Sequence, residues 1–197
     1  MKAVIDTASL FSLVRYYLPF DKERVLFQLL KNKIKNGEII IIDKVLQECS
    51  YLSKGIILKK LPYLSDPEFL KSAKLPINTK SIIAPSPAKF LRQLDNQFVN
   101  TAVKKMKKLS DVEYESQKKS ALEGADMKLV IYCLTLIRES IFNQVYLVTE
   151  ETKSSNDNKL FQKIPFICKE LNIDTLTLPE LLAGYSEIDL EFIKNID

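Results

Sequence analysis

The chain contains no histidine and no tryptophan, and its only cysteines are Cys49, Cys133 and Cys168. Without histidine, Ser-His-Asp and Cys-His catalysis, an imidazole base and a His-ligated zinc site are all excluded. The three cysteines lie far apart among apolar residues and lack CxxC spacing, which favours buried free thiols over a disulfide or a metal site. Any chemistry must therefore use carboxylates, lysines, hydroxyls or thiols.

Long apolar runs are also missing. No run approaches the roughly 18 to 20 residues that a membrane-spanning helix needs. The N-terminus leads directly into an expected strand, without the basic segment and apolar core of a signal peptide. We therefore expect a cytoplasmic protein with no membrane partner. A chain of 197 residues, 46% of them hydrophobic and 27% charged, suits a single globular domain over 1–197.

Charge is distributed unevenly along the chain. The segment from Lys54 to Lys119 holds 14 Lys/Arg and 6 Asp/Glu, whereas the remainder holds 15 and 19. Prolines divide the first half of this segment, so we interpret residues 54–120 as a basic, mostly helical insertion packed on the core. Its lysine cluster is a candidate RNA-binding surface, although a solvated face is an equally good interpretation; the cluster consists of Lys104, Lys105, Lys107 and Lys108.

Four apolar segments, rich in β-branched residues, predict buried strands at 2–5, 39–42, 144–149 and 174–178. Amphipathic patterns between them predict helices at 8–18, 22–36, 44–53, 87–109, 125–138, 166–171 and 179–183. Strands that alternate with helices predict an α/β fold with a central parallel sheet of 4–5 strands and right-handed crossovers.

Acidic side chains recur where these strands end or where the following helices begin. Asp6 ends the first strand, Glu48 borders the apolar face of the next helix, Asp126 lies in a first helical turn, and Glu150 and Glu151 follow the third strand. Each has an ordinary explanation, such as a helix cap, a favourable helix-dipole contact or a solvated loop. Together they can converge at the carboxyl edge of the sheet, where ligands bind in open α/β folds.

Converging carboxylates repel one another unless a cation neutralises them. An all-oxygen ligand set suits Mg²⁺ or Mn²⁺ better than zinc, and such an ion can support hydrolysis of a phosphodiester. Asn156 and Asp157 in the polar loop beyond are weaker candidates, because these residue types are more often found in turns and caps.

Four short motifs share the order and strand-helix context of a known family. They are VIDTAS at 4–9, DKVLQE at 43–48, GADMKLVIYC at 124–133 and VTEE at 148–151. With them the chain resembles the PIN-domain ribonucleases, which include the VapC toxins of toxin–antitoxin pairs. The segment at 163–182 also resembles the closing part of a longer, poorly characterised bacterial branch of that family.

The resemblance implies a three-layer α/β/α PIN-like fold and a metal-binding catalytic set of Asp6, Glu48 and Asp126. The family's fourth acid, usually an aspartate two residues after the threonine, falls on Glu151. Hydroxyl and acidic neighbours would support this set; they are Thr7, Ser9, Thr149 and Glu150.

The sequence thus predicts a Mg²⁺- or Mn²⁺-dependent endoribonuclease that hydrolyses RNA. The alternative is a PIN-like module without catalysis that binds RNA or protein, and a structure-specific DNA nuclease also stays open. A haloacid-dehalogenase-type phosphatase is disfavoured because position 8, where its second aspartate belongs, is alanine. Whether an antitoxin protein or a second copy of the chain is a partner is left open.

Overall fold

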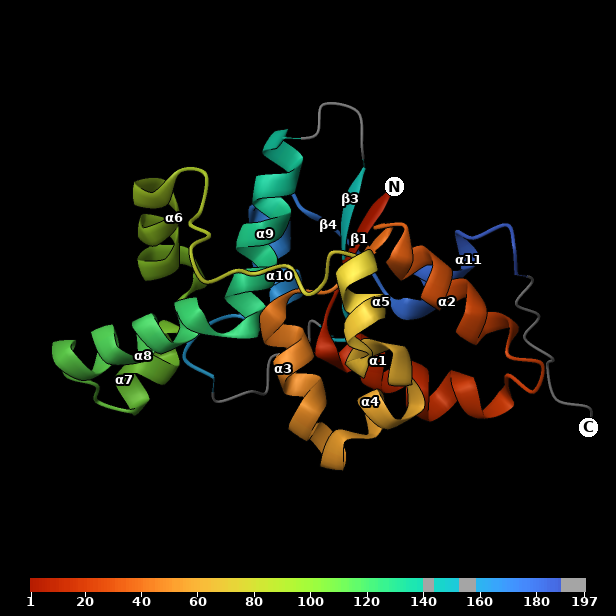
Figure 1. The fold of residues 1–197 in the computed structure, drawn as a ribbon. Coiled ribbons are helices and arrows are strands. Elements are labelled where there is room, and N and C mark those ends of the chain that lie inside the picture. The colour runs from red at the N-terminus through yellow and green to blue at the C-terminus, as the bar shows by residue number, and fades with distance from the viewer. Residues whose placement is uncertain (140–143, 153–158, 189–197) are drawn as a thin grey trace, which may run out of the picture.

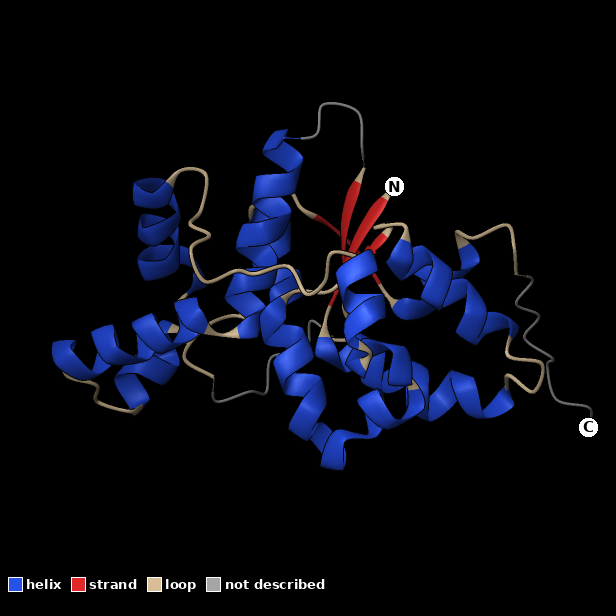
Figure 2. Cartoon of the chain, viewed as in Figure 1, coloured by secondary structure: helices blue, strands red, loops and turns tan. Residues whose placement is uncertain are grey.

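A four-stranded, all-parallel sheet lies at the centre of the molecule, with helices around it (Figures 1 and 2). The computed structural model describes residues 1–139, 144–152 and 159–188. Within these residues the strand order is β2-β1-β3-β4. The strands are β1 (Lys2–Ile5), β2 (Ile39–Ile40), β3 (Val145–Val148) and β4 (Asp174–Leu176). The predicted α/β class, the four strands and their parallel pairing are confirmed.

The register fixes which strand ends meet. Val4 of β1 lies opposite Ile40 on one side and Leu147 on the other. β2 is shorter than the predicted 39–42, since only Ile39 and Ile40 pair with β1 while Ile42 forms an isolated bridge with Ile77. The four isoleucines are nonetheless buried, because parallel strands have both faces covered.

Eleven α-helices occur in the described residues, joined by short 3₁₀ and π turns. They are α1 (Thr7–Ser12), α2 (Val25–Lys35), α3 (Asp43–Tyr51), α4 (Ile56–Lys60), α5 (Pro67–Ser72), α6 (Pro87–Gln93), α7 (Thr101–Met106), α8 (Asp111–Glu123), α9 (Ala125–Glu139), α10 (Ile164–Glu170) and α11 (Leu178–Ala183). None of the described helices is long and apolar enough to cross a membrane.

The connections between strands place helices on both faces of the sheet. α9 and α10 pack together on one side, whereas α2 and α11 lie on the other (Figure 1). In the sheet, β1 and β3 are the two central neighbours. β2 lies on the outer side of β1, and β4 lies on the opposite, outer side of β3. The carboxyl ends of β1 and β3 therefore form a topological switch point, the place where open α/β sheets have a crevice.

Two predicted helices have different boundaries in the structure. The first helix was predicted over 8–18, but the α-helical part ends at Ser12 and continues as a π turn over Leu13–Tyr17 and a 3₁₀ turn over Leu18–Phe20. The second begins at Val25 rather than at 22, yet Asp21 still caps it, because its carboxylate accepts hydrogen bonds from Leu26 N and Phe27 N at 3.2 and 2.8 Å.

The predicted continuous helix over 87–109 is wrong. α6 passes into a π turn at Leu94–Phe98, and the chain then becomes extended at Val99, which forms an antiparallel bridge with Phe161 before α7 begins. The sequence interpretation also missed α8. Its signal was present: Ser110 and Glu113 form a capping box in which each side chain bonds to the backbone of the other residue.

The hydrophobic core is divided into two clusters of very different size. The large one surrounds the sheet and includes the buried faces of α2, α3, α9 and α10. The small one consists of Val99, Tyr114 and Leu160, with Leu109 and Phe161 against it, and it attaches the α7–α8 hairpin to the segment that follows residue 158.

All three cysteines are buried and free, as predicted. Burial raises the pKa of the Cys49 and Cys168 thiols to about 12.

Candidate functional site

A pocket of about 300 Å³ opens at the carboxyl edge of β1 and β3. Four of the predicted acids line it: Asp6 after β1, Glu48 on α3, Asp126 at the start of α9 and Glu151 after β3. These residues are up to 145 positions apart, and only the sheet and its crossovers bring them to one edge. Asn156 and Asp157 lie outside the described residues.

Asp6 is the most buried of the four acids, with 4% of its surface exposed. It caps α1: one carboxylate oxygen accepts a hydrogen bond from Ser9 N at 2.6 Å, and the other accepts one from the Thr149 hydroxyl at 2.6 Å. Burial raises the pKa of Asp6, helped by repulsion from Glu151 and opposed by Ser9 and Thr149. The expected support from Thr149 is thus a direct contact, whereas Ser9 contributes its backbone N–H. The Ser9 hydroxyl is buried and has no hydrogen-bond partner among the described residues.

Glu48 is half-buried and joins α3 to α1. Its carboxylate accepts a hydrogen bond of 2.5 Å from the Thr7 hydroxyl, so Thr7 supports the acid set through Glu48. After α3 the chain turns through three left-handed residues, and Gly55 is the one that cannot carry a side chain. Its φ is +70°, and a Cβ there would lie 2.9 Å from the Ser50 carbonyl oxygen.

Asp126 lies in the first turn of α9, where the helix dipole favours an anion. Its side chain is open to solvent but stands inside the concavity, with the other acids around it. Desolvation by the pocket walls and repulsion from Glu151, Glu48 and Asp6 raise the pKa of Asp126 to about 6, and Lys159 opposes the shift. Its carboxylate forms no hydrogen bond with any residue that the structure describes.

Glu150 and Glu151 are adjacent in sequence but have different surroundings. The Glu151 carboxylate accepts a hydrogen bond from Ile164 N at 3.1 Å and lies 3.3 Å from the Lys159 ammonium. The Glu150 carboxylate accepts a hydrogen bond from Leu178 N at 2.7 Å and therefore caps α11 instead of lining the pocket. The predicted supporting residue Glu150 thus acts on the neighbouring helix.

The donor chemistry of this pocket suits a hard divalent cation, but the present side-chain positions do not form a cage for one. No group of three or more His, Cys, Asp or Glu side chains within residues 1–139, 144–152 and 159–188 is arranged to hold a metal ion. Asp6, Glu48 and Glu151 accept hydrogen bonds from separate partners. Each carboxylate keeps lone pairs that a cation could use, and the metal site stays a prediction.

A second cavity, of about 340 Å³, continues from the first and shares Glu48, Ala125 and Asp126 with it. Its further walls come from the end of α8 and from the extended segment at 159–162, which contributes Lys159, Phe161 and Gln162. The sequence interpretation missed this part of the cleft. No local pattern marks it, because the segment is positioned by the bridge between Val99 and Phe161.

The predicted lysine cluster lies away from the acids. Lys105, Lys107 and Lys108 are exposed, but the Lys104 ammonium stands 3.6 Å from the centre of the Tyr114 ring and is held there by a cation–π contact. The cluster lies near the beginning of α8, whereas the acid pocket adjoins the end of this 13-residue helix. At 1.5 Å per residue the two ends are about 20 Å apart.

Residues 80–187 match the model of a family described as Domain of unknown function (DUF4411), and this match covers more than half of the chain. The chain belongs to the DUF4411 family. The matched residues of this DUF4411 chain include Asp126 and Glu151 but not Asp6 or Glu48. No curated protein and no solved structure matches the chain.

Proposed function

We propose that this DUF4411 protein is a PIN-like phosphodiester hydrolase that cleaves RNA with the help of Mg²⁺ or Mn²⁺. The single observation that carries the proposal is the pocket in which four carboxylates from four separate segments meet at the switch point of a parallel sheet. Acids that raise one another's pKa in this way destabilise the fold, and such groups are typical of functional sites. Helices on both faces of the sheet agree with the α/β/α layers of a PIN-like fold.

In this proposal Asp6, Glu48, Asp126 and Glu151 would hold a divalent cation, which would supply positive charge for the carboxylates and for a phosphate during hydrolysis. Asp126 is the acid most available to the cation, because no described residue hydrogen-bonds to its carboxylate. Asp6 is held in place by Thr149 and by the start of α1. Glu48 and Glu151 would complete the set with the carboxylate lone pairs that the Thr7 and Ile164 hydrogen bonds leave available.

The cavity that continues from the acids gives a substrate strand a path. Lys159 can approach a phosphate next to the cleaved one, and the side chains of Phe161 and Gln162 can contact the neighbouring base. Farther along α8, the exposed lysines at 105, 107 and 108 would hold the RNA backbone in a salt-sensitive manner. A cytoplasmic location, an antitoxin partner and a homodimer remain predictions.

The proposal is tested by incubating labelled single-stranded RNA with the purified protein in Mn²⁺ or Mg²⁺, in parallel with EDTA. We expect cation-dependent cleavage that falls at least about 100-fold in Asp126→Asn, because this variant removes an oxygen charge without changing shape. Asp111→Asn is the matched control, since Asp111 is also a first-turn aspartate but lies on the exposed face of α8. A single-stranded DNA of the same sequence tests the choice of nucleic acid.

The arrangement of hydrogen-bonded acids also favours one alternative, a PIN-like module that binds RNA or protein without cleaving it. Titration calorimetry with Mn²⁺ separates the two. Absence of both cation binding and cleavage, with RNA binding retained, would support the binding module. Cation binding without cleavage would point to a different nucleic acid substrate or to a missing activating partner. If the protein is such a binding module, the Asp126→Asn variant should still bind RNA.

A further inference from the structure

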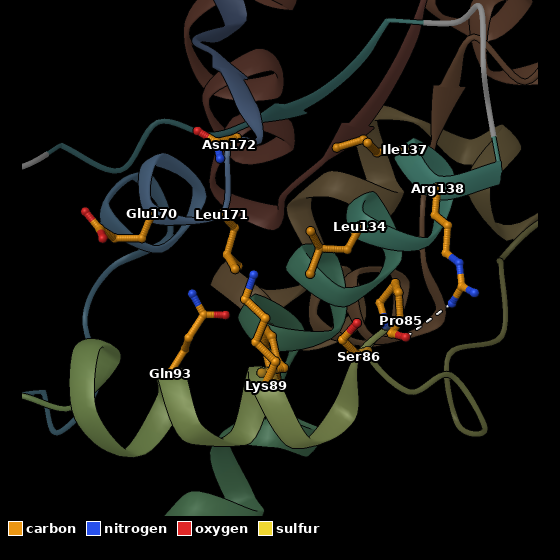
Figure 3. Close-up of a pocket in the computed structure, with 12 residues that line it drawn as sticks. Pro85, Ser86, Lys89, Gln93, Leu134, Ile137, Arg138, Glu170, Leu171 and Asn172 are labelled. Atoms are coloured by element: carbon orange, nitrogen blue, oxygen red, sulfur yellow. Dashed lines mark hydrogen bonds between the residues drawn. The ribbon is translucent and has the colours of Figure 1, made fainter.

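A separate cavity of about 300 Å³ lies between α6, the second half of α9 and the turn that follows α10 (Figure 3). None of its lining residues belongs to the acid pocket or to the cavity that continues from it. All of them lie within the residues that match the DUF4411 model. The two sites are at opposite ends of α9, so a ligand here is independent of the proposed hydrolase chemistry.

The walls of this cavity are apolar, and part of their surface faces solvent. Phe90 and Ala84 are buried beneath it, Leu134 and Leu171 are half-buried, and Ile137 is 40% exposed. The helical pattern of the sequence predicts that Leu134 and Ile137 point into the core. They instead face the cavity, which leaves an apolar surface that a ligand can cover.

Two cations stand at this apolar surface. The Lys89 ammonium extends from α6 toward Leu171, and Arg138 stands on the other side of Leu134 (Figure 3). Arg138 donates one hydrogen bond to the Pro85 carbonyl oxygen, at 3.2 Å, and neither cation forms an ion pair with a described residue. Glu170 is the single acid among the lining residues, and its carboxylate is turned away from the Lys89 ammonium. The cavity therefore favours an anion.

Two side-chain amides complete the lining. Gln93 donates to Gln97 Oε1 at 3.2 Å and keeps its own carbonyl oxygen available. Asn172 has a left-handed backbone, with φ of +54°, directly after α10, and its amide stands at the rim above Leu171 (Figure 3). Amides of this kind supply both donors and acceptors, so they can match the edge of a heterocyclic ring.

The three features together restrict the class of ligand. Inorganic phosphate would use the cations but leave the apolar walls bare, and an aliphatic acid would leave the amides without partners. A nucleotide uses all three, because its base has apolar faces and a hydrogen-bonding edge and its phosphate is an anion. We propose that this cavity binds a nucleoside monophosphate, either as a free molecule or as one nucleotide of an RNA strand, with the exposed side chains of Lys89 and Arg138 turning from opposite sides to its phosphate.

Titration calorimetry of the full chain with the four common 5′-ribonucleoside monophosphates tests the proposal. Nucleosides, which lack the phosphate, and inorganic phosphate, which lacks the nucleoside, each test one half of the ligand. We expect at least one nucleotide to bind more tightly than its nucleoside and than phosphate. Lys89→Met and Arg138→Gln should each weaken that binding about tenfold through loss of a charge-assisted hydrogen bond. Lys71→Met is the matched control, an exposed lysine on α5 that should bind like the wild type.

A competing single-stranded RNA tenmer identifies the source of the nucleotide. Displacement of the bound nucleotide by the tenmer would assign the cavity to an RNA strand, and retention would assign it to a free nucleotide. The proposal is overturned if no nucleotide binds at millimolar concentration, if phosphate binds equally well, or if Lys89→Met and Arg138→Gln leave binding unchanged. Asp126→Asn should bind nucleotide normally, so failure of the hydrolase proposal would not be confused with failure here.

Discussion

The two ends of α9 carry sites of opposite charge. Its first turn contributes Ala125, Asp126 and Leu129 to the acid pocket, and its last turns contribute Leu134, Ile137 and Arg138 to the cation-lined cavity. Each charge agrees with the helix dipole, since an anion is favoured at the N-terminal end and a cation at the C-terminal end. The dipole of α9 therefore favours the charge of the helix's own residue at each site, Asp126 in the acid pocket and Arg138 in the cation-lined cavity.

The two sites differ in how their charges are held. In the acid pocket, hydrogen bonds from Thr7, Thr149 and Ile164 fix three of the four carboxylates, which leaves them close together despite their repulsion. In the cavity, Lys89 and Arg138 are exposed, and no described ion pair holds them. Strand ends position side chains rigidly because the sheet fixes them, whereas a gap between helices leaves long side chains free to meet a ligand.

The largest expected effect is a loss of stability caused by a substitution in the buried middle of α9, the helix that carries both sites. Ile131 is 4% exposed, so Ile131→Ala should lower the free energy of unfolding by about 2 to 4 kcal/mol through lost burial and a residual cavity. Ile137→Ala, the same change on the same helix at a 40% exposed position, should cost less than about 1 kcal/mol. Urea unfolding followed by circular dichroism measures both. Equal losses would contradict the assignment of Ile137 to the cavity.

A smaller expected effect tests how firmly a hydrogen bond holds Asp6 in the acid pocket. Thr149→Val keeps the side-chain shape but removes the 2.6 Å hydrogen bond to the buried Asp6 carboxylate, so it should destabilise the protein by about 2 kcal/mol at pH 7. The loss should shrink in acid, where Asp6 is protonated. Thr135→Val is the control, because the Thr135 hydroxyl donates its hydrogen bond to the Ile131 carbonyl of its own helix and to no other described residue. It should change stability by less than about 0.5 kcal/mol. A similar loss in both variants would argue against a fixed Asp6.

The smallest expected effect is a change of stability with pH, which measures the repulsion among the acids. The pKa of Asp126 is raised from 3.8 to about 6, so the folded state binds this proton more tightly than the unfolded state does. Stability should therefore fall as the pH rises from about 4 to about 6. Asp126→Asn should be more stable than wild type at pH 7, by about 1 kcal/mol because solvent screens this exposed group, and should match it near pH 4.

Asp111→Asn is the control for this pH dependence, since it changes the same residue type in a first helical turn outside the pocket. It should lower stability by only a few tenths of a kcal/mol at pH 7, because it removes a favourable helix-dipole interaction. Chemical unfolding at pH 4 and pH 7 measures all three proteins. An Asp126→Asn variant less stable than wild type at pH 7 would show that the carboxylate is stabilised rather than strained.

Much of the fold was predictable because local patterns and core burial agree. The isoleucines at 39–42 are buried as their composition indicated, and Gly37, with φ of +70°, follows α2 where a helix end was expected. The prediction failed at 87–109, where apolar periodicity continues through Phe98 but the backbone straightens at Val99. Periodicity reports which residues are apolar, and a single long-range bridge to Phe161 is enough to interrupt the helix.

The sequence by itself determined the candidate acids and the absence of imidazole chemistry, because those are properties of residue type and of position at the ends of apolar segments. Only the tertiary structure decided which acids share a pocket. It separated Glu151 from Glu150, gave Thr7 to Glu48 rather than to Asp6, and turned Leu134 and Ile137 toward a cavity. The reason is physical: a side chain's neighbours depend on the packing of elements far apart in the chain, and no local spacing contains that information.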